Sequence, residues 1–461
     1  MSGKERSRPV EENAGLAGLA CCPRMTPRWL VIPVFIVAFL ATAPAYARAP
    51  VILVVFDEFP IDSLRRPDGR IDAARYPAFG RLSRVSTWFP NAFSVQDQTS
   101  HAVPAILDGR YPRPGGRPVY SDHPDSLFTL LASRGYRVTA AEPFTSVCPR
   151  SVCPDSILGG PGPSPFFLSK RAARFRAMLR AIRRTRRPLL IFQHQILPHR
   201  PWEFLPSGRR YRGDPDPWES GLSSPRGFHD AFLTHQNQQR FLLQVGFVDR
   251  QLGLLLDRLE RTALFDRALL VVTADHGIGF DLGVTDRRAA ADASIAEVAP
   301  VPFFVKAPHQ RRSRVRRAYV HTVDVLPTIA DVLGLKLPWN VDGRSAFARR
   351  GAHRVRLPTF DISQWIEIGP ARLERARAAN RRQQARVFGV GDRSLFRFGP
   401  WAGLLGRRVD GFRAHASALT VSGLRTDRIF RPKSDHAPVW FTGRVLGGRP
   451  ASTHRLWFRI T

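Results

Sequence analysis

Two acidic clusters each follow directly after an apolar run, at the point where a buried strand would end. Asp57 and Glu58 follow residues 51–56 (VILVVF), and Asp275 and His276 follow residues 268–273 (ALLVVT) and Ala274. Ligands of open α/β sheets collect at the carboxyl ends of the strands, so parallel strands would bring both clusters to one edge. Carboxylates with an imidazole suit one divalent cation, with Ca, Mn, Mg or Zn all open. Either cluster alone could be an ordinary turn, so the prediction depends on the pair.

Two neighbouring hydroxyls, Thr99 and Ser100, lie between these clusters at the start of a predicted apolar helix within residues 94–112 (SVQDQTSHAVPAILDGRYP). A helix N-terminus receives phosphate and other oxyanions well because its first N–H groups are free. An ordinary N-cap has the same appearance. Beside a metal, however, the Thr99 hydroxyl could ionise and act as a nucleophile.

Strand-like and helix-like segments alternate over about 300 residues, which predicts an α/β domain with a central, mostly parallel sheet flanked by helices. The expected strands are 51–56, 137–141, 189–193, 268–273 and 302–306, and the expected helices are 125–134, 170–187, 229–260 and 321–333. We place this domain at residues 48–350. An arginine-rich helix at 370–388 and short Gly-, Phe- and Trp-containing segments predict a small C-terminal α+β unit at 351–461.

These residues belong to an ordered series of motifs that resembles the sulfatase-like branch of the alkaline phosphatase superfamily, which includes phosphoglycerol and phosphoethanolamine transferases. The resemblance covers roughly residues 50–350. It is carried by 51–60, 99–112, Leu197-Pro-His-Arg-Pro-Trp202, 248–253, Val271-Val-Thr-Ala-Asp-His-Gly277, 301–306, 321–330 and 342–345. It implies an alkaline phosphatase-like fold and an enzyme with one divalent metal ion.

The resemblance also implies roles for individual residues. The metal ligands would be Asp57, with Glu58 as a further candidate, and Asp275, His276 and the Thr99 oxygen. Thr99 would be the nucleophile, with Ser100 as the adjacent alternative that also contacts substrate. His199 would contact the anionic group of the substrate or the leaving group, and Lys306 would help to bind the anion.

The sequence departs from the sulfatases proper at the nucleophile. Those enzymes carry Cys or Ser in a C/S-x-P-x-R box, whose first residue becomes formylglycine, whereas here Thr99 holds that place and Val103 replaces the arginine. Threonine yields no aldehyde. We therefore expect a hydrolase or transferase of phosphate (di)esters or related sulfate esters. The alternatives are a sulfatase acting on sulfated glycans and an inactive ectodomain that binds anionic polymers.

The first 47 residues have the features of a signal peptide or an N-terminal anchor, and Met25 is a candidate true start. Residues 29–43 are apolar, two arginines precede them, and Ala45-Tyr46-Ala47 resembles a cleavage site. We expect an exported protein that is secreted, periplasmic or membrane-anchored. Cys148 and Cys153 are then expected to form a short-loop disulfide.

The chain is strongly basic, with a formal net charge of +32 that comes from 65 arginines and only five lysines. Such a surface suits an anionic ester, a lipid headgroup, a membrane surface or a cell-envelope glycan. A GC-rich genome also produces arginine excess, so the charge is weak evidence about partners. No recognition helix, zinc finger or RNP pattern is present in the sequence, and we predict no nucleic-acid partner. The basic stretch 170–187 is expected to be mainly a solvated helix.

Overall fold

The structure is a computed structural model of the 461-residue chain, in which residues 44–461 form one compact unit. The described residues are 46, 48–154, 157–158, 168, 170–212, 231–283, 287–288, 294–348, 351–359, 361–397, 399, 402–404, 407–408, 420–426, 436–438 and 441–447. The predicted leader, residues 1–47, lies outside them except for position 46. Among these residues, no helix is both long and apolar enough to cross a bilayer.

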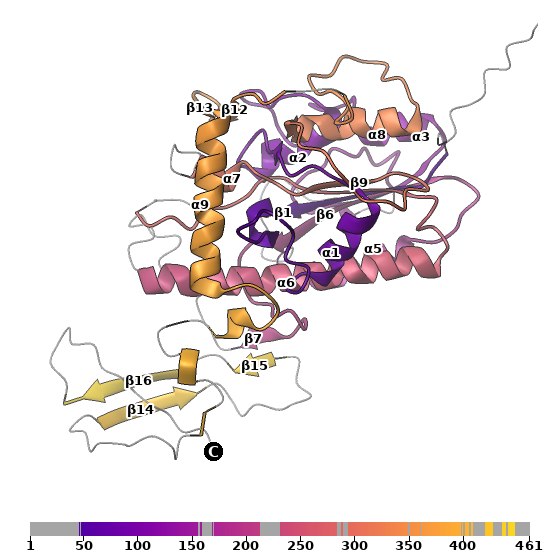
Figure 1. Cartoon of the computed structure of the whole chain (residues 1–461). Helices are drawn as coiled ribbons and strands as arrows, with labels where there is room; N and C mark the ends of the chain where they lie inside the picture. Colours follow the sequence, from indigo (N-terminus) through magenta and orange to yellow (C-terminus); the bar gives the residue numbers. More distant parts are fainter. Residues whose placement is uncertain are drawn as a thin grey trace, which may run out of the picture. The chain divides into compact units, whose positions relative to one another are not determined.

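An eight-stranded sheet lies at the centre of this unit, in the order β10-β2-β9-β8-β1-β6-β4-β5 (Figure 1). Neighbours from β8 to β5 pair in parallel, whereas β9 is antiparallel to both β8 and β2. The sheet is therefore mixed and mostly parallel, as predicted. Its strands are β1 (Val51–Asp57), β2 (Thr87–Trp88), β4 (Arg137–Glu142), β5 (Ile157–Leu158), β6 (Leu189–Pro198), β8 (Leu269–Ala274), β9 (Phe303–Lys306) and β10 (Arg314–Val315).

Helices cover both faces of the sheet, which confirms the predicted α/β architecture (Figure 1). One face carries α1 (Pro77–Val85), α5 (Arg171–Ala181) and α6 (Ala231–Arg261), and the other carries α2 (Thr99–Asp108), α3 (Leu127–Ser133) and α8 (Val325–Leu333). Every residue of β1 is buried, because a central strand between two helical layers has no exposed face. This is why its sequence is a continuous apolar run rather than an alternating one.

The register of β1 against its neighbours brings the two acidic clusters together. Phe56, the last apolar residue of β1, lies opposite Ala274 of β8 and Gln195 of β6. Because these strands run in parallel, Asp57 and Asp275 follow at the same edge. The position of both clusters therefore results directly from strand pairing.

The basic helix is shorter than predicted, since α5 ends at Ala181 rather than near residue 187. Arg258 of α6 donates from Nε to the carbonyls of Leu179 and Ile182, at 3.0 Å in both cases. A side chain that satisfies the last carbonyls of a helix provides a C-terminal stop. The predicted helix 321–333 is likewise divided, into η2 (Thr322–Asp324) and α8.

The predicted disulfide between Cys148 and Cys153 is present. The buried Glu142 carboxylate at the end of β4 holds the start of this loop, because it accepts hydrogen bonds from the Val147 and Cys148 N–H groups, both at 2.9 Å. Thr145 donates a third hydrogen bond to it. The disulfide loop is thereby fixed to the end of a sheet strand.

The C-terminal segment combines helix and strand elements. The predicted helix 370–388 is α9 (Pro370–Phe388), and it contacts α7 (Ile295–Val298) and η1 (Ile61–Leu64). Short paired strands accompany it: β12 (Val355–Pro358) with β13 (Trp365–Ile368), β14 (Thr420–Thr426) with β16 (Phe441–Leu446), and β15 (His436–Pro438) with β7 (Arg210–Arg212). Two further short strands, β3 (Ala92–Phe93) and β11 (Val320–His321), pair with each other. A domain boundary near residue 350 stays a prediction.

Arg377 joins α9 to the segment that follows β1. Its guanidinium is fully buried and contacts the Asp62 carboxylate at 2.7 Å. It also donates to the Pro90 carbonyl at 3.0 Å and to Asn91 Oδ1 at 3.2 Å. Asp62 is also paired with Arg65 and Arg381, at 2.8 and 3.0 Å, so loss of Arg377 leaves the charge of Asp62 compensated but deprives the Pro90 carbonyl of this donor. The C-terminal helix is thus fastened to two loops at the same edge of the sheet as Asp57.

We therefore predict that Arg377→Ala lowers the free energy of unfolding by about 1–3 kcal/mol, as expected when buried acceptors lose their donor. Arg375→Ala, on the exposed side of the same helix, should change it by less than about 0.5 kcal/mol. Urea denaturation followed by circular dichroism measures both. Equal effects of the two substitutions would contradict a specific role for Arg377.

Candidate active site

Asp57 and Asp275 lie side by side at the carboxyl edge of the sheet, and both are completely buried. Backbone hydrogen bonds hold the two segments together, from Asp275 N to the Phe56 carbonyl (2.9 Å) and from Phe59 N to the His276 carbonyl (2.7 Å). The Glu58 N–H donates to Asp275 Oδ1 at 3.2 Å. The two clusters that are 217 residues apart in sequence thus form one site.

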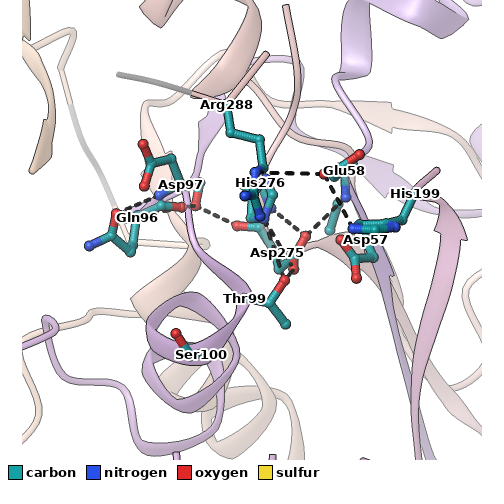
Figure 2. A network of polar contacts seen from close by, with 12 residues as sticks. Asp57, Glu58, Gln96, Asp97, Thr99, Ser100, His199, Asp275, His276 and Arg288 are labelled. Carbon is teal, nitrogen blue, oxygen red and sulfur yellow. Dashed lines mark hydrogen bonds and ion pairs between the residues drawn. The ribbon is translucent and has the colours of Figure 1, made fainter. Parts of the chain in front are cut away.

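Thr99 is the first residue of α2 and points at this pair (Figure 2). Its hydroxyl donates to Asp275 Oδ2 at 2.8 Å and lies 3.5 Å from His276 Nε2. The segment before α2 is fixed to the same strand end, because the buried Ser94 hydroxyl contacts the Asp275 carbonyl. The helix N-terminus and the second acidic cluster are therefore positioned relative to each other by direct contacts.

His276 presents one ring nitrogen to the same region. Its Nδ1 lies 2.9 Å from the Gly277 carbonyl, which can only accept a hydrogen bond, so Nδ1 carries the hydrogen. Nε2 faces Asp275 Oδ2 at 3.6 Å. The turn requires glycine at position 277, because a Cβ there would lie 2.3 Å from the Glu297 carbonyl oxygen.

Glu58 turns away from Asp57 toward arginines, which the sequence did not indicate. Its backbone has a positive φ of 59°, and its carboxylate pairs with the buried Arg287 and lies 3.9 Å from Arg288 Nε. Burial opposes ionisation of this carboxyl, but the charge and hydrogen bond of Arg287, together with the charge of Arg288, outweigh it and hold the pKa of Glu58 well below its ordinary value. The negative charge of Glu58 is already compensated.

His199 lies beside Glu58, with 3.5 Å between Nε2 and Glu58 Oε1. It follows β6 within the predicted Leu-Pro-His-Arg-Pro-Trp motif, and its Nδ1 contacts the Arg200 carbonyl. Burial lowers the pKa of His199 to about 3, although Glu58 opposes that shift. The imidazole is therefore neutral at pH 7 in this arrangement.

His194, in the middle of β6, completes the cluster and was missed from the sequence. Its Nε2 lies 3.6 Å from Asp57 Oδ2 and 3.8 Å from Asp275 Oδ2. The sequence did contain a sign of it, because the polar triplet Gln193-His194-Gln195 interrupts an otherwise apolar strand whose residues are all buried. A polar triplet at such a place needs partners.

The donors of this site fit a divalent cation. Both carboxylate oxygens of Asp57 and both ring nitrogens of His194 are buried without a hydrogen-bond partner among the described residues. Burial and the charges of Asp275 and Glu58 raise the pKa of Asp57 well above its ordinary value. Candidate ligand atoms of Asp57, His194 and Asp275 lie within 4.8 Å of one another, as do those of Asp57, Glu58 and His199. A bound cation would compensate the first group, whereas Arg287 already compensates Glu58 in the second.

Two predicted substrate contacts lie elsewhere. Lys306 is at the opposite edge of the sheet, because β9 is antiparallel and Lys306 pairs with Leu270 near the start of β8. Its Nζ is 4.9 Å from the Phe265 ring centroid and 3.2 Å from the Ala307 carbonyl, so the prediction that it binds the substrate anion at this site is wrong. The Ser100 hydroxyl contacts His101 Nδ1 at 3.2 Å and is set apart from the network of Figure 2.

Comparison with known proteins gives a family match and two curated relatives. The family model described as "Sulfatase" matches residues 50–335. N-sulphoglucosamine sulphohydrolase of Homo sapiens is 25% identical over 342 residues, which cover 66% of this chain and 65% of that protein. The 2,3-bisphosphoglycerate-independent phosphoglycerate mutase of Thermomicrobium roseum is 37% identical over 100 residues, or 21% of this chain and 18% of that one. The chain thus spans less than two thirds of either relative.

A solved structure has the same fold. The phosphonate monoester hydrolase of Agrobacterium radiobacter superposes with a TM-score of 0.52 at 16% sequence identity, over 70% or more of both chains (71% of this chain and 83% of that one). At this level of identity the likeness concerns the fold alone. It agrees with the mixed, mostly parallel sheet and its two helical layers.

We predict that Asp57→Asn and His194→Ala each weaken the binding of a divalent metal by at least about 10–100-fold, the effect expected even when a partner outside the coordination shell is lost. The reason is that each removes one of the buried donors without hydrogen-bond partners. Chelator competition on purified protein measures the affinity. Lys306→Met, at the other edge of the sheet, should leave it unchanged; a wild-type affinity in His194→Ala would remove His194 from the ion's environment.

Proposed function

The chain belongs to the sulfatase family of enzymes, and from that premise we propose that it is a metal-dependent hydrolase or transferase that cleaves phosphate, phosphonate or sulfate esters through Thr99. The observation that carries this proposal is the hydrogen bond from the Thr99 hydroxyl to Asp275 Oδ2. It brings a nucleophilic oxygen, at the N-terminus of a helix, against the buried carboxylates. A module that only binds anionic polymers has no need of a hydroxyl at that point.

The cation would be held by Asp57, Asp275, His276 and the Thr99 oxygen, with His194 beside them. When bound, a divalent ion lowers the pKa of a nearby hydroxyl and compensates negative charge on the ester oxygens. Its identity stays open among Ca, Mn, Mg and Zn. The mixed carboxylate and imidazole donors favour Zn or Mn over Ca.

The chain's own residues supply the remaining chemistry. Thr99 Oγ1 forms a bond to phosphorus or sulfur, its proton passes to Asp275 Oδ2, and the bond to the leaving alcohol oxygen breaks. The leaving oxygen takes up one proton from solvent water, and Asp275 releases the proton it received to solvent, so that the proton count balances. Water or an acceptor hydroxyl then attacks the same atom, releases the group from Thr99, and returns a proton to the threonine oxygen. Free N–H groups in the first turn of α2 can receive the negative oxygens during both steps.

Arg288, rather than Lys306, is the candidate for binding the substrate anion. Its side chain is 24% exposed and lies beside Glu58, whereas Arg287 is almost fully buried in its pair with Glu58. A guanidinium presents several donors to a phosphate or sulfate group. We propose that Arg288 meets the anionic group of the substrate. His199, whose Nε2 faces Glu58, would contact the leaving oxygen.

The second candidate function is hydrolysis of sulfated sugars. The relative named N-sulphoglucosamine sulphohydrolase favours it, although it shares only a quarter of its aligned residues with this chain. The threonine at position 99 favours esters of phosphorus, because the group must be released from it by a second attack at the same atom. Formylglycine, which avoids this second attack, cannot form from threonine.

We also propose that the protein acts outside the cytoplasm. The predicted leader at 1–47 supports this location, as does the disulfide between Cys148 and Cys153, because disulfides persist mainly in oxidising compartments. Lipid headgroups and cell-envelope glycans both carry anionic esters there. Both are proposed substrate classes.

We predict that Thr99→Ala lowers turnover by roughly 10³-fold or more, as loss of a nucleophile does in hydrolases, even when excess divalent metal keeps the site loaded despite the loss of the Thr99 oxygen. Steady-state kinetics and elemental analysis of the same preparation measure turnover and metal loading. Ser100→Ala is the matched control, since it removes the neighbouring hydroxyl that contacts His101, and it should retain activity. Near wild-type turnover in Thr99→Ala would exclude Thr99 as the nucleophile.

The choice between esters is tested with four aryl substrates that share one leaving group: a phosphate monoester, a phosphodiester, a phosphonate monoester and a sulfate ester. We expect a higher kcat/KM on at least one phosphorus ester than on the sulfate. A second round would use a phospholipid headgroup and a sulfated glycan. Preference for sulfate would favour the second candidate, and no turnover of any substrate by metal-loaded protein would favour the inactive binding module.

A further inference from the structure

Arg171, at the start of α5, is completely buried and donates to the loop that carries His199. Its Nη1 donates to the His199 carbonyl at 2.6 Å, and its Nη2 donates to the Pro201 carbonyl at 2.8 Å. A weaker contact of 3.4 Å joins Nη1 to the Ile196 carbonyl. One guanidinium therefore contacts backbone on both sides of His199.

A second side chain holds the same loop from α6. Gln244 Nε2 donates to the carbonyls of Pro198 and His199, both at 2.9 Å. Its Oε1 accepts from the N–H groups of Glu203 and Phe204, at 3.0 and 3.2 Å. The His199 carbonyl thus accepts from two helices at once, and few backbone movements of this residue preserve both bonds.

The charge of Arg171 is compensated by the loop itself. Glu203 Oε1 lies 2.8 Å from Nη2, and the guanidinium carbon lies 5.4 Å from the centre of the Phe204 ring. A planar guanidinium with several fixed donors bonds carbonyls and a carboxylate together in a way that an ammonium cannot. Burying such a charge is costly unless all of its partners remain in place. The loop geometry and the compensation of the buried Arg171 charge therefore depend on each other.

From these contacts we infer that Arg171 is a positioning residue that fixes His199 beside Glu58 and the reacting centre. The inference rests on the proposed function, in which His199 contacts the leaving oxygen. The sequence predicted Arg171 as one member of a solvated basic helix, and most arginines of that stretch are indeed exposed. Arg171 and Arg174 are buried, whereas Arg176, Arg180, Arg183, Arg184, Arg186 and Arg187 are exposed.

The test compares Arg171→Lys and Arg171→Met with Arg176→Met, which removes an exposed arginine from the same helix. A displacement of about 1 Å at a catalytic group can lower the rate about 100-fold. We expect kcat to fall by about 100-fold in Arg171→Met, with KM changed little, and by less in Arg171→Lys, which keeps the charge and one donor group. Arg176→Met should match wild type in both parameters.

A double-mutant cycle distinguishes positioning from a general loss of structure. If Arg171 acts through His199, adding Arg171→Lys to His199→Ala should cause no further loss of kcat, because the group it positions is gone. Multiplicative losses would overturn the inference. We also expect both single variants, Arg171→Lys and His199→Ala, to cleave esters with poor leaving groups more slowly than esters with good ones. This is the result expected when the affected group acts on the leaving oxygen.

A measurement without substrate separates this inference from the proposed function. In protein labelled with ¹⁵N-histidine, the His199 resonance, assigned by its loss in His199→Ala, should show a protonated Nδ1 in wild type and in Arg176→Met. We expect that signal to shift or disappear in Arg171→Lys while the other histidine signals stay in place. An unchanged His199 signal would overturn the positioning role, whatever ester the enzyme cleaves. The two proposals can also fail separately. If the His199 signal is lost in Arg171→Lys but the wild-type protein cleaves no ester, the positioning role stands and the proposed function is overturned.

Discussion

The structure depends on the burial of three carboxylates, Asp57, Glu58 and Asp275, at one edge of a parallel sheet. Like charges in a buried site repel, and each loses its hydration, so an arrangement of this kind persists only with compensating positive charge. Glu58 obtains it from Arg287. Asp57 has no hydrogen-bond partner for either oxygen among the described residues. The difference between these two adjacent residues makes a cation at Asp57 the simplest physical account of the site.

The same constraint explains why the proposed nucleophile lies where it does. Thr99 reaches Asp275 only because Ser94 contacts the Asp275 carbonyl and α2 begins a few residues later. A hydroxyl beside compensated carboxylates, at a helix N-terminus, is placed both for activation and for receiving negative oxygens. The residues that we propose to bind the metal, to attack the ester and to receive its oxygens thus lie at one edge of the sheet, although they come from segments far apart in the sequence.

The sequence predicted those features that depend on local patterns of apolar and polar residues. Apolar runs such as 51–56 fixed the buried strands, and parallel pairing then brought Asp57, Asp275 and His276 together. The sequence could not predict that Lys306 lies away from the site. A five-residue pattern does not show the direction of β9, and because β9 is antiparallel its last residue lies at the opposite edge of the sheet. Arg287 was beyond reach because nothing local distinguishes it among 65 arginines. His194 was within reach, since a polar triplet inside a buried strand is a signal of function, but its partners come only from tertiary pairing.

The remaining precision of the site comes from helices outside the motifs. Arg377 of α9 fastens the segment after β1 and the loop at Pro90–Asn91, and it lies beyond residue 335, where the family match ends. Arg171 and Gln244 hold the His199 loop from α5 and α6. The motif residues supply the reactive groups. The buried arginine and glutamine side chains on the covering helices determine the distances between these groups. Since each of these contacts joins segments distant in sequence, the reaction geometry depends on the completed fold rather than on any one motif.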